Sequence, residues 1–136
     1  MDRRTAQRIA FLYYKEQLDK KGNVPIMSSP QIGKNEWNTI EFINAAINDE
    51  PLENHSMNPV DSVLRMEKYM QEKGQNFMTW VAAKLPNYSK PVYIICQRMG
   101  LKGEKLWYEG CYSSMNEAEY MNETYSKYAL TKIVEI

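Results

Sequence analysis

The chain of 136 residues has few of the side chains that most often carry chemistry, because it contains only two cysteines and one histidine. Cys96 and Cys111 are too far apart to form a CxxC pair, and a single histidine is too few for a His-rich metal site. His55 lies in a polar stretch without a nucleophile signature such as GxSxG, and the sequence has no glycine-rich phosphate-binding motif. We therefore expect no metal site, no cofactor, no catalytic residues and no enzymatic activity.

Long hydrophobic runs are also missing. The two apolar stretches, 77–83 and 92–96, are far shorter than the roughly 20 residues that cross a bilayer. The first residues have no apolar leader, so a secretory signal is not expected. Two cysteines are typical of the reducing cytoplasm, and we favour two thiols over a disulfide. These features predict a cytoplasmic protein that does not interact with a membrane.

The chain also has no excess of positive or negative charge. The 17 Lys and Arg residues balance 17 Asp and Glu residues, so the formal net charge is zero. This balance removes the overall basic bias of a general nucleic-acid binder. A local basic cluster of Arg3, Arg4 and Arg8 remains, and it keeps nucleic-acid binding through the first helix as a third, less favoured hypothesis.

The pattern of apolar residues and end signals predicts an α+β fold in one domain, 1–136, with a mainly helical part (1–86) followed by a ββαβ part (90–136). The predicted helices are Arg3–Lys20, Glu36–Asn48 with Asn35 as its cap, Pro59–Lys73, a short helix over 76–85, and a helix from Ser114 to about Tyr125. The predicted strands are Pro91–Arg98, Lys105–Tyr112 and Leu130–Ile136. The strand over 91–98 is the most continuously apolar, which predicts a three-stranded antiparallel sheet in the order 2-1-3 with this strand in the centre.

What the sequence does contain is a surplus of large amphipathic side chains: ten Tyr, nine Met and three Trp. Two interpretations of this surplus have equal weight. The side chains either form a core in which thioethers fill gaps, or form a surface for a partner, because Tyr, Trp and Met are enriched at interfaces. The first helix has apolar side chains on two faces, more than the single stripe of a surface helix. We expect one of these faces, or an uncovered sheet face, to meet a partner protein or a second copy in a homodimer.

These observations favour a small non-enzymatic binding protein that acts through a protein–protein interface. In size and composition the chain is similar to accessory proteins of bacterial phages and mobile elements, and some of those inhibit host defence proteins by binding them. The candidate binding residues, on the first helix and the sheet, are Arg3, Arg4, Arg8, Phe11, Tyr14, Tyr93, Arg98, Lys105, Trp107 and Tyr108.

The alternative from another class is a small-molecule or nucleotide binder. Its pocket is expected between the Pro-containing loop 22–34 and the sheet face that bears Tyr93, Trp107 or Tyr108. Arg98 and Lys105 would then bind an anionic group of the ligand.

Overall fold

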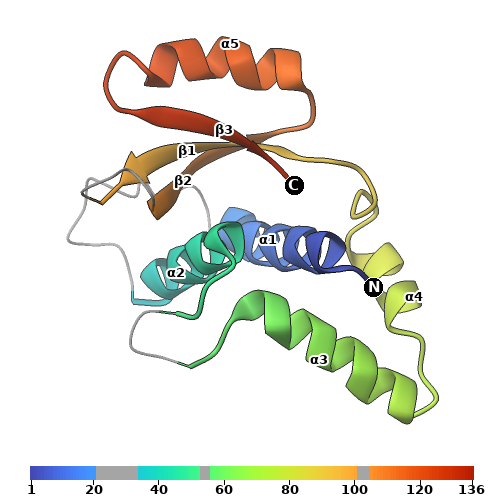
Figure 1. Cartoon of the computed structure of the whole chain (residues 1–136). Helices are drawn as coiled ribbons and strands as arrows, with labels where there is room; N and C mark the ends of the chain where they lie inside the picture. The colour runs from blue at the N-terminus through green and yellow to red at the C-terminus, as the bar shows by residue number, and fades with distance from the viewer. Residues whose placement is uncertain (21–33, 53–55, 101–104) are drawn as a thin grey trace. The chain divides into compact units, whose positions relative to one another are not determined.

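A computed structural model describes residues 1–20, 34–52, 56–100 and 105–136, and for 34–38 it describes the backbone alone. These residues form two compact units, Met1–Tyr88 and Ser89–Ile136 (Figure 1). The first unit is helical and the second contains the sheet, so the division falls where the sequence changes from a helical to a strand pattern. His55, residues 22–33 of the predicted loop, and the turn residues 101–103 lie outside the described residues.

The helical unit consists of α1 (Arg3–Lys20), α2 (Lys34–Asn48), α3 (Pro59–Glu72) and α4 (Phe77–Lys84). In it α1 packs against both α2 and α3, and α3 packs against α4. The bounds of α1 agree with the prediction, and those of α3 and α4 agree to within one residue. The start of α2 was predicted wrongly: the helix begins at Lys34, so Asn35 is one of its residues and not its cap.

Capping side chains fix three of these helix starts. The side-chain oxygen of Asp2 accepts a hydrogen bond from the backbone N–H of Thr5 at 2.8 Å. Asn58 does the same for Val60 at 2.9 Å, and Asn76 for Met78 at 2.9 Å. Each bond satisfies a backbone donor that has no partner within the helix, and each is typically worth about 1 kcal/mol.

The core of the helical unit includes a cluster of buried apolar side chains from α1, α4 and the residue that follows α4. Its members are Ile9, Phe77, Val81 and Leu85, with exposed fractions between 0% and 6%. Partly buried side chains from α3, among them Val63 and Met70, pack against it. Burial of each such side chain stabilises the fold by roughly 1.5–3 kcal/mol, so this cluster fixes how α1, α3 and α4 pack together.

The second unit contains β1 (Tyr93–Met99), β2 (Lys105–Tyr112), α5 (Met115–Tyr125) and β3 (Thr131–Glu135). The strands form an antiparallel sheet in the order β2-β1-β3, which confirms the predicted topology and the central position of β1. α5 covers one face of this sheet (Figure 1). It begins where the sequence predicted, because Ser114 Oγ accepts a hydrogen bond from the backbone N–H of Glu117 at 3.2 Å.

An irregularity that the sequence analysis did not predict interrupts the pairing of β1 with β2. Ile95 lies opposite Gly110 but Cys96 lies opposite Tyr108, so Glu109 is an extra residue on β2. This β-bulge shifts the alternation of side chains along β2.

No helix in the described part of the chain is long and apolar enough to span a membrane.

Candidate functional site: an aromatic groove on the helical unit

A largely apolar groove lies between α1, α3 and α4, and its volume is about 310 Å³. We call it the aromatic groove and define it by its lining residues Ile9, Ala10, Tyr13, Tyr14, Pro59, Ser62, Val63, Met66, Phe77 and Trp80. The polar side-chain atoms of this set are the hydroxyls of Ser62 and the two tyrosines and the indole N–H of Trp80. None of the lining side chains carries a carboxylate, an imidazole, a thiol or an amine.

Five aromatic rings form a continuous series along this groove and beside it. Phe42 of α2 stacks on Tyr14 with ring centroids 4.6 Å apart, and Tyr14 meets Tyr13 edge-to-face at 5.2 Å. Tyr13 lies 6.4 Å from Trp80 of α4, which in turn stacks on Phe77 at 5.7 Å. Each such pair is worth about 0.5–1.5 kcal/mol beyond its buried area, so the rings are held in place before anything binds.

The helical repeat explains how these side chains come together. Tyr13 and Tyr14 are adjacent in sequence and therefore point about 100° apart around α1, so one meets α4 and the other meets α2. Ser62 and Met66 are four residues apart and share one side of α3. The groove thus combines side chains from three helices that no short sequence motif joins.

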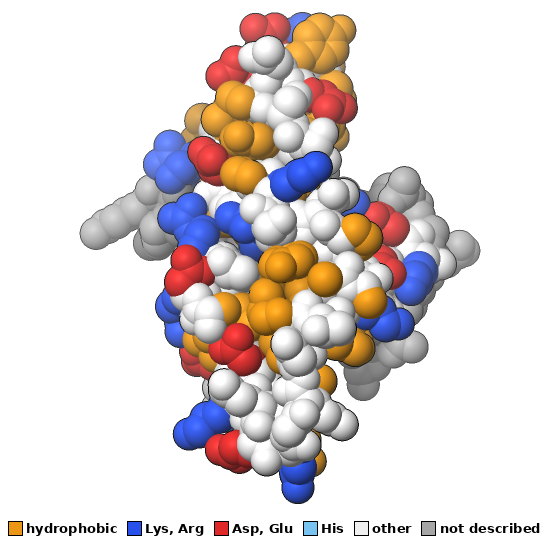
Figure 2. All heavy atoms as spheres, turned by 90° about the vertical axis from the view of Figure 1, so that its right-hand side faces the viewer, with side chains coloured by type: hydrophobic (Ala, Val, Ile, Leu, Met, Phe, Trp, Pro, Cys, Tyr) orange, Lys and Arg blue, Asp and Glu red, His pale blue; other side chains and the backbone are white. Residues whose placement is uncertain are grey.

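Several large side chains of the groove and its rim remain partly exposed. The exposed fractions are 37% for Tyr13, 49% for Met66 and 39% for Trp80, and Tyr69, one turn along α3 from Met66, is 58% exposed. Single exposed apolar residues are ordinary, but a contiguous set often marks a binding surface. Hydrophobic side chains also gather on the face of the molecule that carries α4 (Figure 2).

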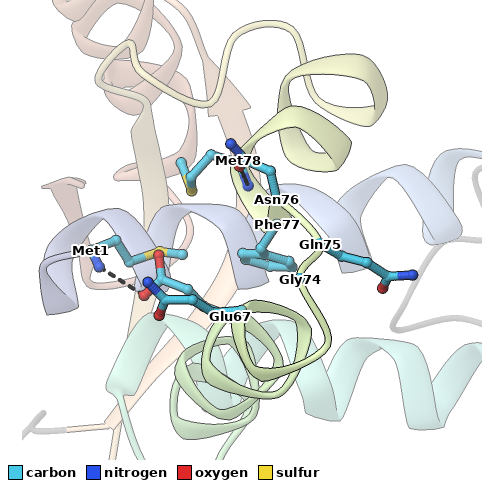
Figure 3. A pocket seen from close by; sticks show the side chains of 8 residues that line it. Met1, Glu67, Gly74, Gln75, Asn76, Phe77 and Met78 are labelled. Carbon is cyan, nitrogen blue, oxygen red and sulfur yellow. Dashed lines mark hydrogen bonds and ion pairs between the residues drawn. The ribbon is translucent and has the colours of Figure 1, made fainter.

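A second hollow, of about 500 Å³, shares the lining residue Phe77 with the aromatic groove (Figure 3). The N-terminal ammonium of Met1 forms an ion pair with Glu67 at 2.8 Å in this hollow. The side-chain oxygen of Asn76 accepts hydrogen bonds from the backbone N–H groups of Met78 and Thr79. Glu67 and Asn76 therefore already have partners within the protein, and we regard the aromatic groove as the stronger candidate.

The predicted basic residue Arg3 is bound by two carboxylates of the protein itself. Its Nε and Nη2 donate to Asp49 at 2.6 Å each, and its Nη1 lies 2.8 Å from Asp61. The hydrogen bonds from Arg3 lower the pKa of the Asp49 carboxyl, and the two carboxylates raise the pKa of Arg3. Arg3 thus joins α1 to the turn after α2 and to α3.

Arg8 also contacts the protein, because its Nη1 donates to the backbone carbonyl of Tyr88 at 3.0 Å while its Nε is buried without a hydrogen-bond partner. Arg4 is exposed. Arg3 and Arg8 of the predicted basic cluster therefore hold parts of the helical unit together.

The predicted aromatic residues of α1 occupy different environments. Phe11 is completely buried and offers no accessible surface. Tyr14 is half-buried and lines the aromatic groove, and burial, followed by the nearby Tyr13, raises the pKa of its hydroxyl. Tyr14 is the predicted site residue that the structure places in the groove.

The structure does not bring the predicted sheet aromatics to one face. Residues that pair across antiparallel strands share a face, and Trp107 pairs with Gln97, which lies on the same face as Tyr93. Tyr108 pairs with Cys96 and lies on the opposite face, where it is largely buried. Trp107 and Tyr108 are consecutive on β2 and therefore point to opposite faces, and the bulge at Glu109 determines that Trp107, not Tyr108, shares the face of Tyr93.

The two predicted anion-binding residues of the sheet lie at the same end of the β1–β2 pair but on opposite faces. Lys105 pairs with Met99, whereas Arg98 pairs with Leu106. Both are exposed and both have interactions with other groups of the protein. They therefore do not converge on one ligand position.

Sequence reasoning missed most of the groove residues as site residues: Tyr13, Met66, Phe77 and Trp80. The available signal was a second apolar stripe on the helix over 59–73, since Met66, Tyr69 and Met70 recur at spacings of three and four beside the stripe that begins at Val60. A helix with two apolar stripes has more than one packed surface.

Comparison with protein-family models, with curated proteins and with solved structures finds no match to this chain.

Proposed function

We propose that this chain is a non-enzymatic binding protein whose aromatic groove takes up an apolar segment of a partner protein. The observation that carries the proposal is the series of aromatic rings that already contact one another, of which Tyr13 and Trp80 remain partly exposed in the groove. Large aromatic and thioether side chains in a defined concave surface are typical of the residues that dominate protein–protein binding energy.

The chemistry of the lining supports binding more than catalysis. General acid–base or nucleophilic catalysis needs a titratable or nucleophilic side chain within reach of the reacting atoms. In the aromatic groove the groups of this kind are the two tyrosine hydroxyls and Ser62, and Ser62 Oγ donates to the backbone carbonyl of Asn58 at 3.2 Å. Shape and apolar area are therefore the main features that the groove offers to another molecule.

The exposed area in the groove is enough for measurable affinity. Side chains of roughly 200 Å² that are 37–49% exposed leave about 80–100 Å² each, and Tyr13, Met66 and Trp80 together leave about 250 Å². At about 25 cal/mol per Å² their burial contributes about 6 kcal/mol, before the contribution of the partner's own apolar surface. Association costs at least about 4 kcal/mol, so the expected affinity is moderate and depends on all three anchors.

We favour a protein partner over nucleic acid because Arg3 and Arg8 are engaged within the protein, which reduces the charge that α1 offers to phosphates. Inhibition of a host defence protein, as in the phage accessory proteins that this chain is similar to in size and composition, is one activity that such a groove serves.

Selection of binding peptides tests the proposal even while the natural partner is unidentified. A library of random peptides of about 20 residues, displayed on phage, is selected against the wild-type protein. Enriched peptides are then titrated against the Met66→Asp variant, which places a charge in the groove, and against Tyr120→Asp, which places the same charge on an exposed site of α5.

We expect selected peptides to lose at least about tenfold in affinity with Met66→Asp, since a carboxylate is poorly accommodated in an apolar contact, and to bind Tyr120→Asp as they bind the wild type. Met66 is half exposed, so the variant should retain the wild-type circular dichroism spectrum and melting temperature. Peptides that bind both variants equally, or a library that yields no specific binder, would refute the proposal.

A further inference from the structure

The walls of the aromatic groove restrict the conformation of whatever protein segment binds there. All three walls are helices, and their backbone groups are already hydrogen-bonded within each helix. The Ser62 hydroxyl donates to the carbonyl of Asn58 and accepts a weak contact from Arg65 Nη2 at 3.5 Å. An extended segment in this groove would leave much of its own backbone unpaired, whereas a helix satisfies its backbone internally.

The rim of the groove along α3 is positively charged. Arg65 contacts the groove residue Ser62, and the Lys73 ammonium lies 5.6 Å from the centre of the Tyr69 ring, one turn beyond Met66. No ion pair among the described residues involves Arg65 or Lys73, although ion pairs engage other cations of the helical unit, such as Lys15 with Asp19. These two rim cations are therefore available to carboxylates of another molecule.

The acidic residues near this rim do not cancel its charge. Asp61 is paired with Arg3 at 2.8 Å. Glu72 lies seven residues beyond Arg65 and therefore shares its side of α3, but it is about 10 Å farther along the helix axis, and no ion pair among the described residues joins the two. Arg65 and Lys73 thus outweigh Glu72 and leave this rim with a net positive charge, so the complementary partner is anionic.

We infer that the segment bound in the aromatic groove is an amphipathic helix of a different protein whose apolar stripe is flanked by carboxylates about two turns apart. This inference rests on the proposed function. Arg65 lies on α3 and Lys73 is the residue that caps its C-terminal end, eight residues on, which corresponds to about 12 Å along the helix axis, so carboxylates seven or eight residues apart on a helix lying along α3 match them. A second copy of this chain would bring the same rim cations toward each other, which disfavours a symmetric dimer through this groove.

Three synthetic helical peptides test the inference directly. They share one apolar stripe, taken from a groove-dependent peptide of the display selection, and carry a pair of Glu, Gln or Lys residues two turns apart at its edge. Binding to the wild-type protein is measured by fluorescence polarisation at low and at high salt. A fourth peptide has the Glu composition with a central proline that prevents a helix.

We expect the Glu peptide to bind about tenfold more tightly than the Lys peptide at low salt, with a smaller difference at high salt because these charges are exposed. The double variant Arg65→Glu, Lys73→Glu should reverse the order of the two peptides, and the matched double variant Lys127→Glu, Lys132→Glu in the second unit should leave it unchanged. The proline peptide should bind at least about tenfold more weakly than the Glu peptide.

This inference would be overturned if the Glu and Lys peptides bound with equal affinity, or if the proline peptide bound as tightly as the Glu peptide. In either case peptides that still lose affinity with Met66→Asp would leave the proposed function standing, whereas the absence of any groove-dependent peptide would remove both. A dimer in analytical ultracentrifugation that Met66→Asp dissociates would show that a second copy occupies the groove, and would also overturn the inference.

Discussion

The two asparagine caps of α3 and α4 give a sharp prediction, because they make the same bond in different electrostatic surroundings. Asn58 is 6% exposed, and besides capping Val60 it donates from Nδ2 to Asp49 Oδ1 at 3.1 Å. Asn76 caps α4 at an exposed position, where the hydrogen bonds of its side chain go to backbone N–H groups. Aspartate caps a helix as well as asparagine, so Asn→Asp changes charge and little else at the exposed site.

We expect Asn76→Asp to change the free energy of unfolding by less than about 0.5 kcal/mol, and Asn76→Ala to lower it by about 1 kcal/mol. Asn58→Ala should cost about 2 kcal/mol, because it removes the cap and leaves the buried N–H of Val60 without a partner. Asn58→Asp should also cost about 2 kcal/mol, because two carboxylates would then lie within about 3 Å of each other.

Equilibrium unfolding in urea, followed by far-ultraviolet circular dichroism, measures these four values. The loss in Asn58→Asp should become smaller in acid, where one of the two carboxylates is protonated, and the loss in Asn58→Ala should not. If Asn58→Asp is as harmless as Asn76→Asp at neutral pH, the contact between α3 and the turn at Asp49 is wrong, and so is the position of the groove wall formed by α3.

Three further results are expected. Phe77→Ala should lower the free energy of unfolding by about 3–4 kcal/mol in urea denaturation, because Phe77 is 5% exposed and belongs to the core cluster, and a loss below about 1 kcal/mol would contradict that placement. The hydrogen bonds from Arg3 lower the pKa of Asp49 in the folded state, so the Asp49 carboxylate stabilises the fold above its unfolded pKa of about 3.9, and this stabilisation is lost as the pH falls through the folded-state pKa. The difference in unfolding free energy between the wild type and Asp49→Asn should therefore shrink in acid. A difference that stays constant with pH would refute the Arg3–Asp49 assignment. Burial raises the pKa of the Cys96 thiol to about 12, so a thiol reagent should modify the partly exposed Cys111 quickly and Cys96 only on unfolding, and equal rates would contradict this.

Local signals in the sequence were sufficient for most of the fold. Asn58 followed by Pro59 marks the start of α3, and Ser114 followed by Glu117 marks the start of α5, because each pattern satisfies backbone donors that the first turn leaves open. The topology of the sheet followed from the short hairpin and from the apolar character of β1. Such features depend on neighbouring residues and can be recognised without knowing the tertiary structure.

The aromatic groove could not be predicted in the same way. Tyr13, Met66 and Trp80 lie on three helices and are brought together by the core cluster around Ile9, whose packing is a tertiary property. Phe11 shows the same difficulty, since its apolar character agrees equally with a surface anchor and with the buried position that it has. The extra residue at Glu109 likewise has no clear sequence signal, and it determines that Trp107 rather than Tyr108 shares a sheet face with Tyr93.

The indole N–H resonance of Trp80 gives the most direct test of binding at the groove. In ¹H–¹⁵N spectra recorded during titration with a display-selected peptide, the Trp80 signal, assigned with Trp80→Phe, should shift in a saturable way, and the signal of Trp107 on β2 should stay in place. The opposite result, in which Trp107 shifts and Trp80 does not, would place the binding surface on the sheet and contradict the role of the aromatic groove.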